Sequence, residues 1–267
     1  MDIINHGVII SQRQSDYVGG TLPYEVRNPS GDWTPYLPPG EWQRNNFFDT
    51  FACVTFSFLN SVETQYKFLT GIERNFSDRE LAKASDTIPN VGNSLWHVAD
   101  TARAEGIVDE SVWPAPENYT ELVYYASIPQ DVKDQAKLFL KDWEIKYEWI
   151  DTSKESLMHH IKHAPIQVVL PGHAVLDFLT TQQIINYFDS YAPFQKQTEQ
   201  ILWAMKIVLN RRIKMLDKDD VRFLYALEGF HDEAGVEFWG DGTHTLKDYK
   251  KARVPDKVLE LTKLVLI

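Results

Sequence analysis

Asp-Thr-Phe-Ala-Cys-Val-Thr-Phe-Ser-Phe-Leu-Asn, residues 49–60, decides the fold of this chain, and it contains the only cysteine, Cys53. Asp49 or Thr50 can cap a helix here, because either side chain can accept a hydrogen bond from a free backbone amide. Apolar residues then recur at helical spacing, which predicts a helix with one buried face over residues 53–69. Cys53 is therefore expected in the first turn of a buried helix.

Two interpretations of Cys53 follow from that position. Unpaired amides and the helix dipole at a helix N-terminus favour a thiolate over a thiol, as in a reactive cysteine. A lone cysteine is more often a small buried hydrophobic residue with no chemical role. The rest of the chain has to decide between them, because a nucleophile needs a base.

The composition limits the classes of protein to which this chain can belong. The chain has 267 residues, 43% of them hydrophobic and 13% aromatic, which is enough for a substantial core. A single cysteine allows no internal disulfide, so we expect a reducing compartment. The first residues lack the features of a signal peptide, and no apolar stretch is long enough to span a membrane. The formal net charge of −11 argues against nucleic acid as a partner.

Apart from the helix at Cys53, the first 165 residues divide into an arm, a strand and several helices. Residues 1–47 are rich in Gly, Pro, Asn and Ser and predict an irregular arm. Residues 144–150 alternate as a strand. Helices are expected where capping residues precede apolar periodic runs: after Ser77, which forms a capping box with Glu80; from Ser94 to Gly106; from Pro129 to about residue 140; and from a second capping box, Thr152 to Glu155, to near His163.

The histidines His159 and His163 are four residues apart on one predicted helix, so both could bind one metal ion. No third ligand is apparent nearby in the sequence. Histidines exposed to solvent are the simpler interpretation, and the same holds for His97 on the polar side of its helix. We therefore predict no metal site.

Residues 166–170, 173–179 and 183–189 have the pattern of three strands joined by tight turns. His173 opens the second strand and Asp189 closes the third. In an antiparallel pair these two positions are close in space. A histidine backed by a carboxylate, together with a cysteine at a helix N-terminus, supplies the parts for thiol nucleophilic catalysis.

The order of these motifs resembles the papain-like cysteine proteases, from about Gln43 to Pro193. Each motif alone is weak, but several in the right order make the resemblance specific. The matching stretches are Cys53-Val54-Thr55-Phe56-Ser57 for the family's Cys-Trp-Ala-Phe-Ser, Asn75 to Leu81 for Asn-Leu-Ser-Glu-Gln-Glu-Leu, His173-Ala174-Val175 for His-Ala-Val, and Asp189-Ser190-Tyr191 for Asn-Ser-Trp.

This resemblance implies an α+β, papain-like two-lobed fold over residues 1–193. A helical lobe would carry Cys53, and an antiparallel β lobe would carry His173 and Asp189. It further implies a cysteine endopeptidase that cleaves peptides or proteins without cofactor or metal. Cys53 would attack the carbonyl, His173 would protonate the leaving amine, and Asp189 would orient the ring where the family usually has Asn.

The resemblance also suggests which residues surround the substrate. The Cys53 amide and a side-chain donor would hold the oxyanion. Gln43 is the preferred donor because the family uses a Gln, although Asn45 and Asn46 are closer to Cys53 in the sequence. Gly92 and Asn93 stand where the family has a Gly-Gly pair, and Tyr191 stands where it has a Trp, so these residues would line the substrate cleft. The short stretch before His173 removes one wall of that cleft. These departures leave substrate preference open, with a weakly active or retired enzyme as an alternative.

Beyond Pro193 the resemblance ends, and residues 194–267 are expected to form a helical C-terminal module. Residues 198–215 carry apolar residues at helical spacing, residues 219–227 a second such run, and a last helix starts at Pro255. The module would be either a cap on the body or a docking surface for a larger assembly.

The chain also resembles phage- and bacterium-encoded papain-like proteins without signal peptide or prodomain. The alternative function is therefore a phage virion or assembly component that uses the fold as a scaffold, located in the cytoplasm or in the virion.

Overall fold

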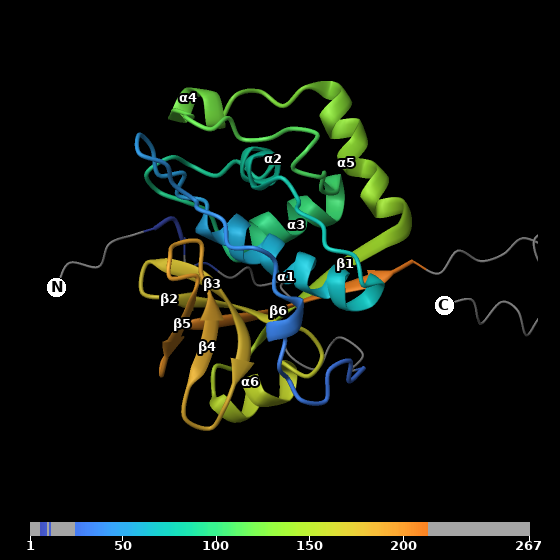
Figure 1. The fold of residues 1–267 in the computed structure, drawn as a ribbon, viewed down its shortest axis with the longest axis vertical. Helices are drawn as coiled ribbons and strands as arrows, with labels where there is room; N and C mark the ends of the chain where they lie inside the picture. The colour runs from blue at the N-terminus through green and yellow to red at the C-terminus, as the bar shows by residue number, and fades with distance from the viewer. Residues whose placement is uncertain (1–5, 10, 12–24, 213–267) are drawn as a thin grey trace, which may run out of the picture. The chain divides into compact units, whose positions relative to one another are not determined.

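The computed structural model describes residues 6–9, 11 and 25–212. The chain divides into two compact units, Met1–Arg211 and Arg212–Ile267, and every described helix and strand belongs to the first. Figure 1 shows most of the helices of this unit gathered on one side, with the strands and α6 on the other. The described helices are η1 Thr34–Tyr36, α1 Cys53–Thr70, α2 Asp78–Ala84, α3 Leu95–Glu105, α4 Glu121–Tyr124, α5 Gln130–Asp142 and α6 Lys154–His160.

Local sequence signals explain several helix ends. The Ser77 side chain accepts a hydrogen bond from the Glu80 amide at the start of α2, as the capping box predicts. Gly71 ends α1 in the left-handed conformation with φ of 72°, a conformation that glycine adopts without a steric penalty. These ends fix α1 as a long buried helix that begins at Cys53.

The predicted cap of α1 is wrong. The N-cap residue is Ala52, and no side chain caps the helix. Asp49 Oδ1 instead accepts a hydrogen bond from the Phe51 amide at 3.0 Å, and Thr50 Oγ1 accepts one from the Ala52 amide at 3.3 Å. Both side chains bond to the backbone two residues ahead, so they stabilise the loop before the helix rather than the helix itself.

The described strands form one six-stranded antiparallel sheet in the order β1-β6-β2-β3-β4-β5. The four strands predicted before residue 190 are confirmed. A β-hairpin joins β2 to β3, and β3 pairs in turn with β4. The strands are β1 Trp143–Ile150, β2 Ile166–Leu170, β3 His173–Thr180, β4 Ile185–Phe188, β5 Gln195–Thr198 and β6 Trp203–Arg211.

The helix predicted over residues 198–215 is wrong wherever the structure describes it. Residues 203–211 form β6, an inner strand between β1 and β2. Met205, Ile207 and Leu209 alternate onto the face that packs against the helices, and this spacing of two is the period of a strand. Residues 194–211 therefore complete the sheet instead of starting a separate helical module. The predicted helices at 219–227 and from Pro255 lie outside the described residues.

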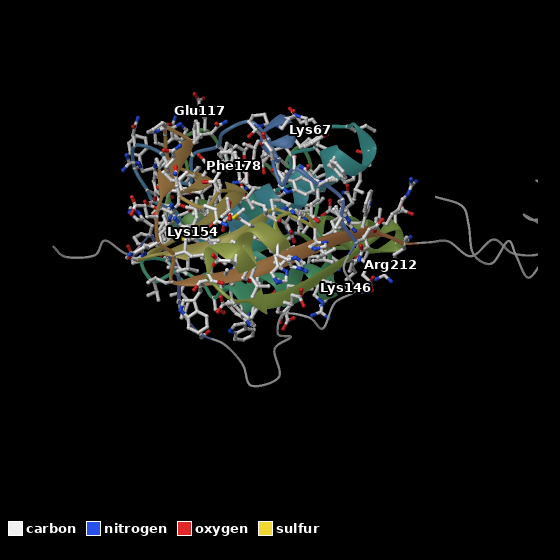
Figure 2. The ribbon with its side chains drawn as sticks, turned by 90° about the horizontal axis from the view of Figure 1, so that it is seen from below. Lys67, Glu117, Lys146, Lys154, Phe178 and Arg212 are labelled. Atoms are coloured by element: carbon white, nitrogen blue, oxygen red, sulfur yellow. The ribbon has the colours of Figure 1, made fainter. Side chains whose placement is uncertain are left out.

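Among the described residues, the two largest of four apolar clusters form most of the core. One joins α1, α3 and α5 to β1 and β6, and it includes Cys53. The other surrounds Trp33 and joins α6 to β2, β3 and β4; it contains Phe178, which is labelled in Figure 2. Within the described part of the chain, no helix has the length and apolar character needed to cross a lipid bilayer.

Candidate active site

Cys53 is the first residue of α1, and it is completely buried. The helix lies against β3, so that the Ala174 amide donates a hydrogen bond to Cys53 Sγ at 3.4 Å. The N-terminal end of the helix dipole favours negative charge at the same place. The structure therefore places the thiol at the N-terminus of α1, in contact with the residue that follows His173.

His173 and Asp189 are brought together by the pairing of β3 with β4. His173 Nε2 lies 2.7 Å from Asp189 Oδ1, and both side chains are buried. The other ring nitrogen, Nδ1, is buried and has no hydrogen-bond partner within the described residues. Burial lowers the pKa of His173, but the hydrogen bond to Asp189 and the adjacent Cys53 side chain outweigh it and raise the pKa to about 9. The raised pKa favours the imidazolium form of the ring.

Lys196 of β5 extends this arrangement, and the sequence analysis did not find it. Its Nζ donates to Asp189 Oδ2 at 2.6 Å. Burial raises the pKa of Asp189, but the hydrogen bonds from His173 and Lys196 prevail and hold it below its usual value. We call Cys53, His173, Asp189 and Lys196 the His173 cluster. An acidic side chain stands here where the resemblance implies Asn, and Lys196 compensates its charge.

Gln43 is fully buried close to this cluster. The Ser190 hydroxyl donates to Gln43 Oε1 at 2.6 Å. This hydrogen bond orients the amide group so that Nε2 faces away from Ser190. Nε2 then donates to the His6 carbonyl at 3.2 Å and to Asp49 Oδ1 at 3.1 Å. The predicted oxyanion donor thus already holds a peptide carbonyl oxygen.

Asp49 organises the loop before Cys53, a role that the sequence analysis missed. Besides Gln43 Nε2 and the Phe51 amide, its carboxylate accepts a hydrogen bond from the Tyr191 hydroxyl. The Tyr191 ring in turn lies 5.6 Å from the His173 ring. A single carboxylate therefore ties the loop of the nucleophile to the segment that follows the His173–Asp189 pair.

Residues 6–9 pass through this region, and no motif in the turn-rich arm indicated it. The His6 amide donates to the Gly172 carbonyl at 2.6 Å, and the His6 ring lies 5.0 Å from the His173 ring. The Asn93 amide donates to the Gly7 carbonyl at 2.9 Å, and the Ile9 amide donates to the Asn93 carbonyl at 2.7 Å. Asn93, predicted to line the substrate cleft, therefore holds the main chain of the arm.

The predicted absence of a metal site concerns His159 and His163, whose rings lie 5.3 Å apart. His163 Nδ1 lies 2.7 Å from the Glu25 carbonyl oxygen. Within residues 6–9, 11 and 25–212, no group of three or more His, Cys, Asp or Glu side chains is arranged to hold a metal ion.

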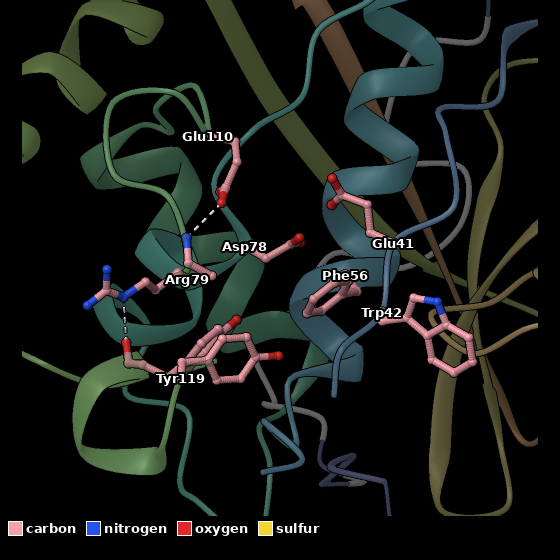
Figure 3. Close-up of a pocket in the computed structure, with 9 residues that line it drawn as sticks. Glu41, Trp42, Phe56, Asp78, Arg79, Glu110 and Tyr119 are labelled. Atoms are coloured by element: carbon pink, nitrogen blue, oxygen red, sulfur yellow. Dashed lines mark hydrogen bonds between the residues drawn. The ribbon is translucent and has the colours of Figure 1, made fainter. Parts of the chain in front are cut away.

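A second cluster of ionisable groups lines a cavity of about 250 Å³ (Figure 3). We call its carboxyl groups, Glu41, Asp78 and Glu110, the acidic pocket. Burial raises the pKa of Asp78 well above its usual value, with further contributions from Glu41 and Glu110, and burial also raises the pKa of Glu110. The charge of Arg79 opposes the rise at Glu110 without reversing it, and its guanidinium donates to main-chain carbonyls such as that of Tyr124. The raised pKa values of Asp78 and Glu110 favour the protonated forms of these two carboxyl groups.

No protein-family model matches the sequence, and no curated protein matches it. Solved structures do match. A digestive procathepsin L 3 of Tenebrio molitor is 16% identical, with a TM-score of 0.55 over 77% of each chain. A structure from a study of the mite allergens Blo t 1 and Der p 1 is 14% identical, with a TM-score of 0.52 over 72% of this chain and 74% of that one. A cysteine protease of Carica candamarcensis with E-64 is 14% identical, with a TM-score of 0.51 over 66% and 96%.

These structural neighbours are papain-like cysteine proteases. The protein therefore has the papain-like two-lobed α+β fold, which confirms the fold class predicted from the sequence. At these identities the likeness shows the fold alone.

Proposed function

We propose that the protein is a cysteine peptidase that cleaves peptide bonds through Cys53, His173 and Asp189. The observation that carries the proposal is the His173 ring, which binds Asp189 through Nε2 while its buried Nδ1 stays unpaired beside Cys53. A histidine held in this way can exchange a proton only through Nδ1. That is the nitrogen a nucleophilic thiol requires.

In the first half of the reaction, Cys53 Sγ as a thiolate attacks the peptide carbonyl carbon. The oxyanion receives hydrogen bonds from Gln43 Nε2 and the Cys53 amide. The His173 imidazolium gives its Nδ1 proton to the leaving amine nitrogen as the C–N bond breaks. The products are a free amine and an acyl thioester on Cys53.

In the second half, neutral His173 takes a proton from water, and the hydroxide attacks the thioester carbonyl. The C–S bond breaks, the acid product leaves, and the Cys53 thiolate and His173 imidazolium are restored. Asp189 stays a carboxylate throughout and orients the ring, because the hydrogen bonds from His173 and Lys196 keep its pKa low. Gln43 is presented to the carbonyl by Ser190.

The test uses the pH dependence of Cys53 alkylation by iodoacetamide, which reports on one site because the chain has a single cysteine. We expect the rate to rise with a midpoint well below that of a free thiol, about 8.5. In His173→Ala the midpoint should move to that of a free thiol. Cys53→Ala should retain the fold by circular dichroism and lose all hydrolysis of a mixed peptide library.

The alternative, a phage virion or assembly scaffold, predicts the opposite results. Cys53→Ala would then be silent, and Cys53 would titrate like free cysteine in both proteins. Association with partners would depend on the chain after Pro193, and light scattering of the full chain and of a truncation would report it. An alkylation midpoint unchanged by His173→Ala would overturn the peptidase proposal.

A further inference from the structure

Gly7 lies in a narrow space between the main chain of Phe51 and that of Gly92, which we call the glycine slot. A Cβ on Gly7 would lie 1.9 Å from the Phe51 carbonyl oxygen and 2.4 Å from the carbonyl carbon. A Cβ on Gly92 would lie 1.9 Å from the Gly7 carbonyl oxygen. The colliding atoms are backbone, which cannot swing aside like the end of a side chain. Only glycine fits at position 7.

Both walls of the slot are held in place. Phe51 has φ of 56°, a left-handed conformation that is strained for a bulky residue and that marks functional positions more often than others. Its amide is fixed by Asp49 Oδ1 at 3.0 Å. On the other side, Gly92 donates to the Ile88 carbonyl at 2.7 Å, and the Asn93 side chain donates to the Ser85 carbonyl at 2.7 Å. Hydrogen bonds within the rest of the protein therefore keep the slot narrow, whether or not residues 6–9 occupy it.

The slot adjoins the reactive groups. Phe51 is separated from Cys53 by one residue, Ala52. The residue before the slot's occupant, His6, contacts the His173 ring and gives its carbonyl oxygen to Gln43 Nε2. Cys53 itself is 0% exposed. We expect a peptide that reaches Cys53 to replace residues 6–9 and to pass main chain through the same slot, because His6 occupies Gln43 Nε2 and contacts the His173 ring.

We propose that the glycine slot is a specificity subsite: the enzyme takes peptides with glycine at the residue that enters it, and residues 6–9 fill it as an internal peptide ligand. The inference rests on the proposed peptidase function, because it names the substrates of the same site. An alanine in the slot would meet fixed backbone on the Phe51 side. Overpacking of this kind predicts a preference for glycine over alanine of roughly tenfold or more.

The first test is Gly7→Ala in the full chain. The new Cβ should expel residues 6–9 and raise the rate of Cys53 alkylation by about tenfold or more, because the open form becomes populated. Gly71→Ala is the matched control: Gly71 also has a left-handed φ, of 72°, but nothing lies within 4 Å of its Cβ position. It should place a Cβ at a positive φ without a collision and leave the alkylation rate unchanged. Ile9→Pro offers a second release, since it deletes the amide that donates to Asn93 without adding an atom to the slot.

In the second test, the segment that fills the slot is added as a separate peptide. A peptide of residues 4–11 should slow Cys53 alkylation in Gly7→Ala or Ile9→Pro protein, and the same peptide with alanine at its Gly7 position should protect at least about tenfold less. Equal protection by the two peptides would overturn the inference, as would no gain in alkylation rate in either variant. Neither readout requires hydrolysis.

Cleavage of peptide libraries separates this inference from the proposed function. Libraries with glycine or alanine fixed at each position in turn should be cut preferentially where glycine is fixed at one position. Cleavage without any glycine preference would leave the peptidase proposal standing and refute the subsite. Glycine-selective protection with no cleavage of any peptide would support the subsite as a binding site and refute the peptidase proposal.

Discussion

The His173 cluster and the acidic pocket both bring several ionisable side chains together in the same compact unit, but they order their charges in opposite ways. In the His173 cluster the signs alternate from His173 through Asp189 to Lys196, and the Cys53 thiolate of the proposed mechanism would continue this order. In the acidic pocket Glu41, Asp78 and Glu110 have the same sign, and the nearby Arg79 is directed at main-chain oxygens.

The two arrangements shift pKa values in opposite directions. Desolvation alone disfavours every buried charge. In the His173 cluster the alternating partners overcome it, so that the pKa of His173 rises to about 9 and that of Asp189 falls. In the acidic pocket burial and like charges act together, and the pKa of Asp78 rises well above its usual value. A buried side chain therefore keeps its charge more readily where it has an oppositely charged neighbour.

Removal of the His173 side chain, the central member of the His173 cluster, should have the largest effect on peptide hydrolysis. His173→Ala deletes the proton donor for the leaving amine, and we expect peptide hydrolysis to fall by about 10³-fold or more. The measurement is kcat/KM on a peptide that the native protein cleaves. His97→Ala, on the polar side of α3, is the control and should retain activity. An equal loss in both variants would mean that histidine deletion acts through stability instead of proton transfer.

Local sequence predicted the central part of the His173 cluster but not its surroundings. Cys53, His173 and Asp189 sit at element ends with clear local signals, so strand alternation and antiparallel pairing were enough to bring two of them together. Lys196 was missed because its contact depends on β5, which the sequence analysis did not predict. His6 was missed because an irregular arm has no periodicity to fix where it docks.

The error over residues 203–211 has a different cause. Apolar residues at 201, 202, 205, 208 and 209 fit a helix, whereas Met205, Ile207 and Leu209 fit a strand equally well. Tertiary context decided between them, because β6 fills the space between β1 and β2. Its Lys206 pairs with Glu148 of β1 at 2.6 Å, with both side chains almost fully buried, and only the sheet register makes that pairing visible.

The acidic pocket gives a prediction for stability. Since the folded-state pKa of Asp78 lies above its unfolded value, the folded protein holds more protons there, and this group makes stability fall as pH rises through the window between the two values. Asp78→Asn removes that penalty. The variant should match the native protein near pH 4 and be more stable at pH 8, by about 1.4 kcal/mol for each unit of pKa difference.

Urea unfolding at the two pH values measures this difference. Asp86→Asn is the control, because Asp86 is exposed and its left-handed φ of 53° suits Asn as well as Asp. It should show no pH-dependent gain. Loss of stability in Asp78→Asn at pH 8 would mean that Asp78 is ionised and paired, and the contrast with the His173 cluster would then disappear.

The smallest effect is expected at the outer end of the His173 cluster. Lys196→Met removes the cation beside Asp189, so the pKa of that carboxyl should rise towards its usual value. A depressed carboxyl pKa stabilises the fold above the unfolded value and loses that contribution as pH falls through the folded value. The variant should therefore be less stable at pH 7 and approach the native protein at pH 3. Because Lys196 is 27% exposed and screened by solvent, the loss at pH 7 should stay under about 1 kcal/mol and shrink with added salt.

Lys146→Met is the matched control, since Lys146 pairs with Glu144 at 3.0 Å but both side chains are more than one-third exposed. Urea unfolding should show a pH-dependent loss for Lys196→Met and almost none for Lys146→Met. Equal losses would mean that Lys196 contributes only as a surface charge and that the alternation of signs ends at Asp189.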